Sequence, residues 1–254
     1  MLARMEMELG LEEPLSYQMS SLFHGVLMEQ LSEEYADKLH QSQLHPYSQH
    51  LEWREKKWYW VVNCFNEEAV SNIMTGALMN LDDFEIKKRN LNVKICQKNY
   101  ETISHKDFLN FFYDEEEIRY IQVQFLTSTA FKQRGQYVFY PDLRCIYQSL
   151  MNKYEYASRD SMMTDEETLN ELCEHSQIVS YELKTVPFSL EKVKIPAFVG
   201  KITIKMQGTK TMARFARFLF EFGTYSGVGI KTAIGMGALK VVRNGGRNSD
   251  RRSC

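Results

Sequence analysis

The sequence lacks long uncharged hydrophobic segments. No window of about 18 residues is free of charge, as a membrane-spanning helix would require, and residues 1–6 contain no apolar signal-peptide core. We therefore expect a cytoplasmic protein that does not contact a membrane. Its 254 residues, 44% of them hydrophobic, suit one large domain or two small ones.

Paired cysteines are also missing. The five cysteines are scattered, with no Cys-x-x-Cys pair and no clustering with histidine of the kind that binds zinc. His40, His45 and His50 are too loosely spaced around Pro46 for a zinc site. The sequence therefore predicts reduced thiols, with no metal and no cofactor.

Neither sign of charge is in large excess. The formal net charge of −2 argues against a uniformly basic nucleic-acid-binding protein. The charges are unevenly distributed, however, because the chain from Lys192 onward has 13 basic and two acidic residues, whereas the first 191 residues have 18 basic and 31 acidic ones. This asymmetry predicts a basic C-terminal surface that faces a polyanion.

The sequence does contain a glycine cluster near its C-terminus. Five of the 13 glycines lie between Gly223 and Gly237, after a segment with helical apolar spacing and before the strand-like residues 238–242. Glycine tolerates positive φ and lets several backbone N–H groups approach one phosphate. Alternatively, the glycines provide only a tight connection between a helix and a strand.

The cluster does not match either common phosphate-binding loop. A Walker A loop would need glycine at Tyr225 and Ile230, and a dinucleotide loop would need glycine or alanine at Thr232 and a preceding strand. What remains is two Gly-x-Gly pairs separated by five residues: Gly227, Gly229, Gly235 and Gly237.

This pattern resembles the C-terminal glycine-rich loop of the CRISPR-associated endoribonucleases that cut the repeats of precursor CRISPR RNA. Further stretches support the resemblance in the same order along the chain: Leu22–Met28, Tyr35–His40 with His45–Ser48, and Phe125–Lys132 with Tyr137–Asp142. Together they cover nearly the whole chain. The resemblance implies two tandem ferredoxin-like domains that bind CRISPR repeat RNA, and it allows association with other Cas effector subunits or as a homodimer.

Hydrophobic patterning agrees with this α+β fold. In the first half, the patterning predicts strands and helices in the order βαββαβ, which is ferredoxin-like: 3–9, 15–31 with 33–40, an extended or turning segment at 44–47, 58–65, 66–79 and 84–96. The second half shows a similar order: 118–127, 143–154, 165–174, 178–186, 198–206, 211–222 and 238–242. We expect domains at 1–115 and 116–243, with the glycine-rich loop in the second, and a disordered tail at 244–254.

Histidines provide the most plausible RNA-cleaving chemistry, because a group with a pKa near 6.5 can move protons while the RNA 2′-hydroxyl attacks its own phosphate. The resemblance implies that His40 is the catalytic histidine. It also implies an assisting tyrosine and lysine at places that here hold Met28 and about Gln43. The helper is therefore left open among nearby residues, with Lys38 and Tyr47 taken as catalytic candidates beside Ser42 and His45. By themselves, His45 and His50 are expected as exposed polar residues, and His24 as a core or interface residue.

Candidate RNA contacts come mainly from the second half. Lys231 adds a charge to the glycine loop, and the strand alternation at 198–206 turns Lys201 and Lys205 away from the core. The spacing of the helix at 211–222 places Arg214, Arg217 and Glu221 on one face. The RNA-binding candidates are Lys132, Arg134, Lys201, Lys205, Arg214, Gly227, Gly229, Lys231, Gly235 and Gly237.

The sequence thus predicts a metal-independent endoribonuclease that matures CRISPR RNA and leaves 2′,3′-cyclic phosphate and 5′-hydroxyl ends. One alternative is a non-catalytic subunit that holds repeat RNA in an effector complex, which the missing tyrosine and lysine favour. The other is an unrelated nucleotide-binding enzyme built on the glycine loop. The failure of both phosphate-loop templates counts against it.

Overall fold

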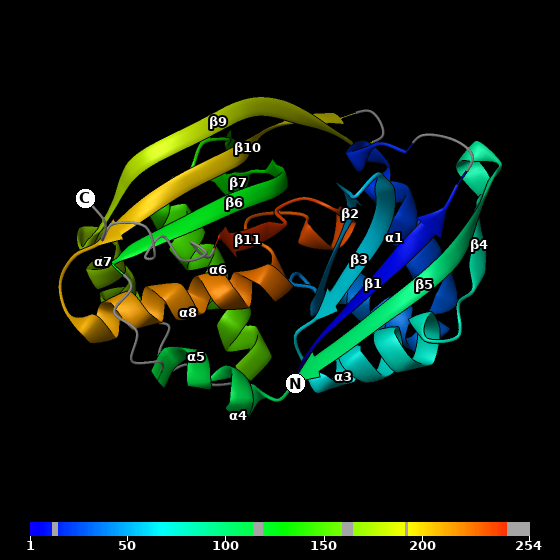
Figure 1. Cartoon of the computed structure of the whole chain (residues 1–254), viewed down its shortest axis with the longest axis horizontal. Coiled ribbons are helices and arrows are strands. Elements are labelled where there is room, and N and C mark those ends of the chain that lie inside the picture. Colours follow the sequence, from blue (N-terminus) through cyan, green and yellow to red (C-terminus); the bar gives the residue numbers. More distant parts are fainter. Residues whose placement is uncertain (12–14, 114–118, 159–164, 191–192, 243–254) are drawn as a thin grey trace, which may run out of the picture.

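The computed structural model describes residues 1–11, 15–113, 119–158, 165–190 and 193–242. Two antiparallel sheets stand side by side, each with helices packed on one face (Figure 1). The expected domain boundary at residues 115 and 116 and the expected disordered tail at 244–254 lie outside the described residues.

The first sheet has ferredoxin-like topology. Its strand order is β2-β3-β1-β5-β4, which is the ferredoxin-like order with β4 added as an extra edge strand. The elements of this half are β1 (Leu2–Gly10), η1 (Tyr17–Met19), α1 (Ser20–Gln30), α2 (Glu33–Gln41), β2 (Tyr47–Arg54), β3 (Lys57–Cys64), α3 (Glu67–Ala69), η2 (Val70–Leu78), β4 (Asp83–Ile86), η3 (Lys87–Arg89) and β5 (Leu91–Ile103).

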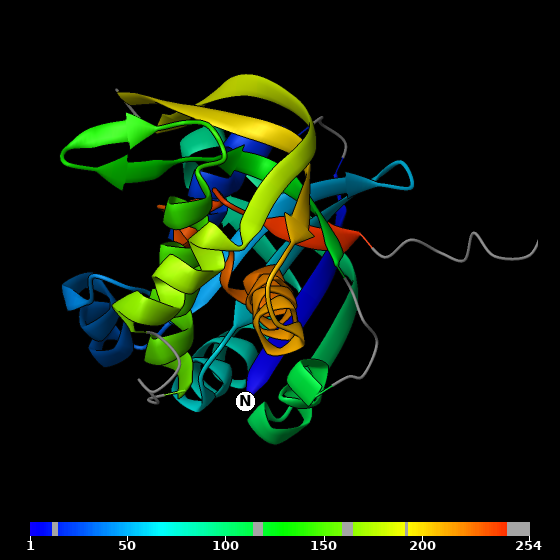
Figure 2. The ribbon, with the colours of Figure 1, turned by 90° about the vertical axis from the view of Figure 1, so that its left-hand side faces the viewer.

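The second sheet repeats this topology with the strand order β11-β6-β10-β9. Its elements are α4 (His105–Phe108), α5 (Asn110–Tyr113), β6 (Tyr120–Thr129), β7 (Phe131–Gln133), β8 (Gln136–Val138), α6 (Leu143–Ser158), α7 (Glu166–Glu174), β9 (Ser176–Leu190), β10 (Val193–Met206), α8 (Lys210–Ser226), η4 (Thr232–Ile234) and β11 (Leu239–Val242). The predicted tandem ferredoxin-like fold is confirmed. Strands β9 and β10 are longer than predicted, and β7 and β8 form a hairpin that projects from the body (Figure 2).

Local sequence signals account for several helix starts. The side chains of Ser32, Asn66 and Thr209 each accept the backbone N–H three residues later, which caps α2, α3 and α8. The expected α-helix at 66–79 is mostly a π-helix, however. It ends with a bond from the Met79 amide to the Met74 carbonyl, 2.9 Å long and spanning five residues.

Helix α8 contacts both halves of the chain. It packs under the second sheet and extends toward the first, where Phe222 meets Phe65 with ring centroids 5.8 Å apart (Figure 1). Arg217 and Glu221, which were expected to share one face of the helix with Arg214, are buried and lie 3.9 Å apart as an i,i+4 ion pair. Burial on all sides is typical of a core helix.

Polar side chains of the first sheet hold the end of α8. Arg4 donates to the Thr224 carbonyl at 2.6 Å, and Ser48 donates to the Tyr225 carbonyl at 2.6 Å. Asn63 links the two, since it accepts from Arg4 and donates to Ser48. The last carbonyls of a helix have no partner within it, so these bonds satisfy them. They also fix where the glycine loop begins.

Candidate active site

Three histidines gather near the start of β2. His40 is exposed in the last turn of α2, His45 is half-buried just before β2, and His24 is half-buried on α1. The ring of Tyr47 lies next to two of them, with its centroid 6.3 Å from that of His24 and 5.7 Å from that of His45, and the charge of His40 acts on both histidines. His45 was expected to be exposed, and the structure corrects this because Pro46 turns the chain inward at the start of a buried strand.

Hydrogen bonds hold the ring of His24. Its Nδ1 lies 3.0 Å from the Tyr47 hydroxyl, and the ring also bonds the backbone of Ala233. Met28 lies one turn later on the same face of α1 and places its sulfur 3.9 Å from the same hydroxyl. The resemblance implies a tyrosine on the first helix, where this chain has Met28. The hydroxyl of Tyr47, which comes from β2, lies beside Met28 instead.

His24 and His45 are uncharged near neutral pH. Burial, followed by the nearby His45 and His40, lowers the pKa of His24 to about 4. Burial and then the charge of His40 lower the pKa of His45, whose Nδ1 is buried without a hydrogen-bond partner in the described part of the chain. A neutral imidazole can accept a proton, so the side chains of His24 and His45 have one of the properties that acid–base catalysis needs.

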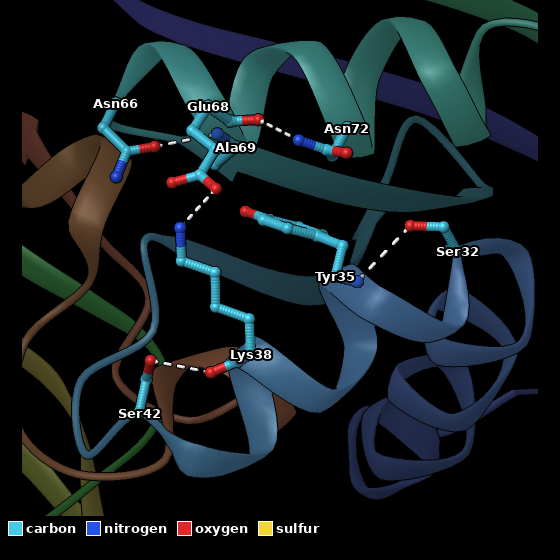
Figure 3. A network of polar contacts seen from close by, with 8 residues as sticks. All are labelled: Ser32, Tyr35, Lys38, Ser42, Asn66, Glu68, Ala69 and Asn72. Carbon is cyan, nitrogen blue, oxygen red and sulfur yellow. Dashed lines mark hydrogen bonds and ion pairs between the residues drawn. The ribbon is translucent and has the colours of Figure 1, made fainter.

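Lys38 lies away from these histidines. Its ammonium group forms an ion pair with Glu68 of α3, on the side of α2 that faces α3 (Figure 3). Residues two apart on a helix point in nearly opposite directions, about 200° apart at 3.6 residues per turn. Lys38 and His40 therefore cannot serve the same site, which argues against Lys38 as the catalytic helper.

Tyr47 belongs to the core. Its side chain is fully buried, and burial raises the pKa of its hydroxyl well above the usual range. A group that RNA cannot reach does not act on RNA directly. The expected catalytic role of Tyr47 is thus replaced by a positioning one, in which its hydroxyl orients His24.

The glycine loop has the predicted sharp backbone, but its amides point inward. Gly227, Gly229, Gly235 and Gly237 all have positive φ. Their N–H groups donate respectively to the Gly223 carbonyl, the Ser149 hydroxyl, the Thr232 carbonyl and the Ser128 carbonyl. These four amides are therefore not available to cradle a phosphate, and the glycines serve the shape of the loop.

The loop also packs tightly against its surroundings. A Cβ on Gly237 would lie 2.0 Å from the Val228 carbonyl oxygen, and one on Gly235 would lie 2.1 Å from Cβ of Ser20 at the start of α1. Gln49 donates to the carbonyls of both Ser20 and Ala233, at 2.8 and 3.2 Å. The loop is thus fixed to the half of the chain that carries the histidines.

A buried lysine lies beneath the loop. The ammonium group of Lys153, on α6, donates to the carbonyls of Ser226, Gly227 and Gly229 and to the Thr232 hydroxyl, at 3.1 to 3.3 Å. Burial lowers its pKa to about 7. The carbonyls that it binds therefore face inward. The side chain of Lys231, whose φ is +57°, is exposed on the outside of the loop. Nothing near Lys153 in the sequence predicted this contact.

A pocket of about 500 Å³ lies between the glycine loop and His45. It is lined by Gln43, Leu44, His45, Phe131, Lys132, Gln133, Arg144, Cys145, Gln148, Ser149, Asn152, Lys153, Gly229, Ile230, Lys231, Thr232 and Ala233. These residues come from both halves of the chain, and no aspartate or glutamate is among them.

The predicted basic residues fall into separate groups. Lys132 and Lys231 line the pocket, and Arg134 lies nearby at the turn of the β7–β8 hairpin. Lys201 and Lys205 are on the open face of the second sheet, whereas Arg214 is on α8 beneath the opposite face. The structure therefore does not bring all of these cations into one surface.

His50, expected to be exposed, is only 6% exposed on β2. Burial, followed by the charges of Arg4 and Arg54, lowers its pKa to about 3. It is therefore a buried neutral residue of the first sheet.

The described residues include no group of three or more His, Cys, Asp or Glu side chains placed to hold a metal ion. Within the same part of the chain, none of the helices is both long and apolar enough to cross a membrane.

Comparison with known proteins identifies the family. The model of the family "CRISPR-associated endoribonuclease Cas6" matches residues 123–239. A protein of that name from Streptococcus thermophilus is 37% identical over 223 residues, 86% of this chain and 89% of the relative. Another from Mycobacterium tuberculosis is 32% identical over 252 residues, 94% of this chain and 78% of the relative.

Solved structures show the same fold. A Cas6 product complex matches with a TM-score of 0.78 and 20% identity over 95% of this chain and 99% of the other. Thermus thermophilus Cas6 matches with a TM-score of 0.69 and 19% identity over 95% and 98% of the two chains. By its sequence similarity along most of its length, the chain belongs to the Cas6 family of CRISPR-associated endoribonucleases.

Proposed function

We propose that the chain cuts CRISPR repeat RNA without a metal ion, by attack of a 2′-hydroxyl on the adjacent phosphate. The observation that carries this proposal is the group of three histidines beside a pocket lined by lysines and no acids. Solved relatives that are described as a product complex and a substrate mimic complex support RNA as the substrate. The products would be a 2′,3′-cyclic phosphate and a 5′-hydroxyl, and the cut would release mature CRISPR RNA.

The bond changes need one proton acceptor and one donor. As the 2′-oxygen bonds to phosphorus, its proton passes to a base, while the departing 5′-oxygen takes a proton from an acid. His45 suits the base, because its lowered pKa keeps it neutral and it lines the pocket. His40, exposed at the end of α2, suits the acid.

The cations near the site would stabilise the phosphate. Lys231 and Lys132 line the same pocket as His45, and Arg134 lies at the turn of the adjoining hairpin. Charge that develops on the phosphate oxygens is stabilised by such preorganised donors. Lys201, Lys205 and Arg214 would contact more distant parts of the RNA, where they add affinity through the phosphate backbone.

Substitution of the histidines tests these roles. We expect His40→Ala and His45→Ala each to slow cleavage by about 10²–10⁴-fold, the usual contribution of proton transfer. Affinity for a repeat RNA with a deoxyribose at the cut should stay nearly unchanged. Lys38→Ala is the matched control on the same helix, and it should leave the rate within about threefold, because exposed ion pairs contribute only ~0–1 kcal/mol.

The pH dependence of the cleavage rate separates the two histidines. Wild-type protein should show a bell-shaped profile, with the acidic limb set by the base and the alkaline limb by the acid. His45→Ala should remove the acidic limb and His40→Ala the alkaline limb. A Lys38→Ala variant as impaired as His40→Ala would contradict this assignment, as would full activity in either histidine variant.

A further inference from the structure

We infer that the pocket between His45 and the glycine loop binds a single RNA nucleotide next to the cut, with its base inserted into the pocket and its phosphate at the rim. This inference rests on the proposed function, since it names the part of the RNA that the same site holds. The pocket volume of about 500 Å³ falls within the range of roughly 300–1,000 Å³ that is usual for small-ligand sites.

The charge of the pocket fits a phosphate. Its lining contains three lysines and one arginine but no acid. The guanidinium of Arg144 is already engaged by Glu166 and Asn170, and Lys153 is engaged by the loop. Lys132 and Lys231 are exposed, which leaves these two ammonium groups at the rim to contact a phosphate.

The walls of the pocket fit a base. Phe131, Ile230 and Leu44 provide apolar surface, and a base can stack on an aromatic ring such as that of Phe131. Side-chain amides from α6, β7 and the α2–β2 segment surround the apolar part: Gln43, Gln133, Gln148 and Asn152. An amide offers both a donor and an acceptor, so these groups can bond the edge of an extruded base.

The position of His45 sets which nucleotide this is. His45 lines the pocket, so its imidazole borders the space that the base would occupy. A base held here puts its own ribose and phosphate beside the imidazole. The pocket should therefore hold one of the nucleotides that flank the scissile phosphate.

The pocket is preorganised on the side of the loop. Lys153 ties four loop oxygens to α6, and Ser149 accepts the Gly229 amide at 2.8 Å. The wall that carries Lys231 is therefore fixed before RNA binds, which reduces the entropic cost of binding.

The test uses repeat RNAs in which one base at a time is removed on either side of the cut, with a deoxyribose at the cut to prevent cleavage. Affinities are measured for wild-type protein and for Gln148→Leu, which replaces a pocket amide on α6. Gln30→Leu is the matched control at the exposed end of α1, outside the pocket. A second pocket variant, Gln133→Leu on β7, guards against local misfolding, and thermal unfolding confirms that each variant is folded.

We expect that removal of one particular base beside the cut weakens wild-type binding by about 5- to 150-fold, since base stacking is worth ~1–3 kcal/mol. This loss should shrink in Gln148→Leu or Gln133→Leu and persist in Gln30→Leu. Equal effects at all positions, or the same selective loss in every variant, would overturn the inference.

Parallel cleavage assays on the all-ribose RNAs distinguish failure of the inference from failure of the proposed function. Normal cutting with no base-selective loss of affinity would reject only the nucleotide pocket. A base-selective, pocket-dependent loss of affinity without any cutting would support the pocket and reject the proposed chemistry.

Discussion

The close packing of the glycine loop can be tested quantitatively, because Gly237 in the loop can be compared with two glycines elsewhere in the chain that have different surroundings. Gly237 has a φ of +71°, and a Cβ there would lie 2.0 Å from the Val228 carbonyl oxygen. Gly135 has a φ of +82°, but a Cβ there would meet nothing within 4 Å. Gly25 lies within α1, also in open space and without a positive φ.

The expected costs of substitution by alanine follow from these differences. Gly135→Ala should lower the free energy of unfolding by about 1–2 kcal/mol, the cost of a left-handed backbone for a residue with a Cβ. Gly237→Ala bears the same cost and must also shift the backbone. That shift strains the bonds from the Gly237 amide to Ser128 and from the Val228 amide to the Gly237 carbonyl. With ~0.5–1.5 kcal/mol for each of these two bonds added to the backbone cost, Gly237→Ala should lower the free energy of unfolding by about 2–5 kcal/mol in total. Gly25→Ala should instead stabilise the protein by about 0.5–1 kcal/mol.

Urea unfolding of the three variants, followed by circular dichroism, measures these free energies. If Gly237→Ala unfolds no more easily than Gly135→Ala, the reasoning about close packing is wrong. A Gly237→Ala variant of full stability that no longer binds RNA would likewise show that this glycine serves the phosphate and not the loop.

Two further predictions follow from buried ionisable groups. Lys153 titrates at about 7 when folded, so the unfolded chain binds more protons above that pH and stability should rise with pH. From pH 7 to pH 9 the free energy of unfolding of the wild type, measured in urea, should rise by about 2 kcal/mol relative to that of Lys153→Met. Parallel pH profiles of the two proteins would contradict this. Lys153→Met should also bind RNA more weakly, because its loop has lost the bonds to α6. His50 has a pKa lowered to about 3, so stability is lost as pH falls below 6.5, by up to about 2 kcal/mol at pH 5. His50→Gln should flatten that part of the profile, whereas Gln30→Leu should leave it unchanged.

Much of the fold was predictable because it is encoded locally. The alternation around Ile202 sets which face of β10 is buried, and Ser32 marks the start of α2 through its side-chain cap. The helical period also separates Lys38 from His40. Their spacing in the sequence is enough to exclude a shared site.

The site was less predictable because it depends on contacts between distant segments. Lys153 donates hydrogen bonds to carbonyls more than 70 positions later in the chain. No local sequence pattern predicts an ammonium group beneath a glycine loop. Glycine spacing indicates a sharply turned loop, but it does not say which of the loop's amides and carbonyls bond within the protein and which face outward. The position of His24, four residues before Met28 on the same helix face, was a usable signal, but its bond to Tyr47 needed the path of β2.

The central claim is that this protein cuts repeat RNA through the 2′-hydroxyl without a metal ion. The most direct test is to incubate purified protein with repeat RNA in excess EDTA, beside the same RNA carrying a deoxyribose just upstream of the cut. The account predicts cleavage of the all-ribose RNA, with a 2′,3′-cyclic phosphate end, and an intact deoxy-substituted RNA. Cleavage of both RNAs, or loss of all cleavage in EDTA with recovery on addition of a divalent metal ion, would contradict it.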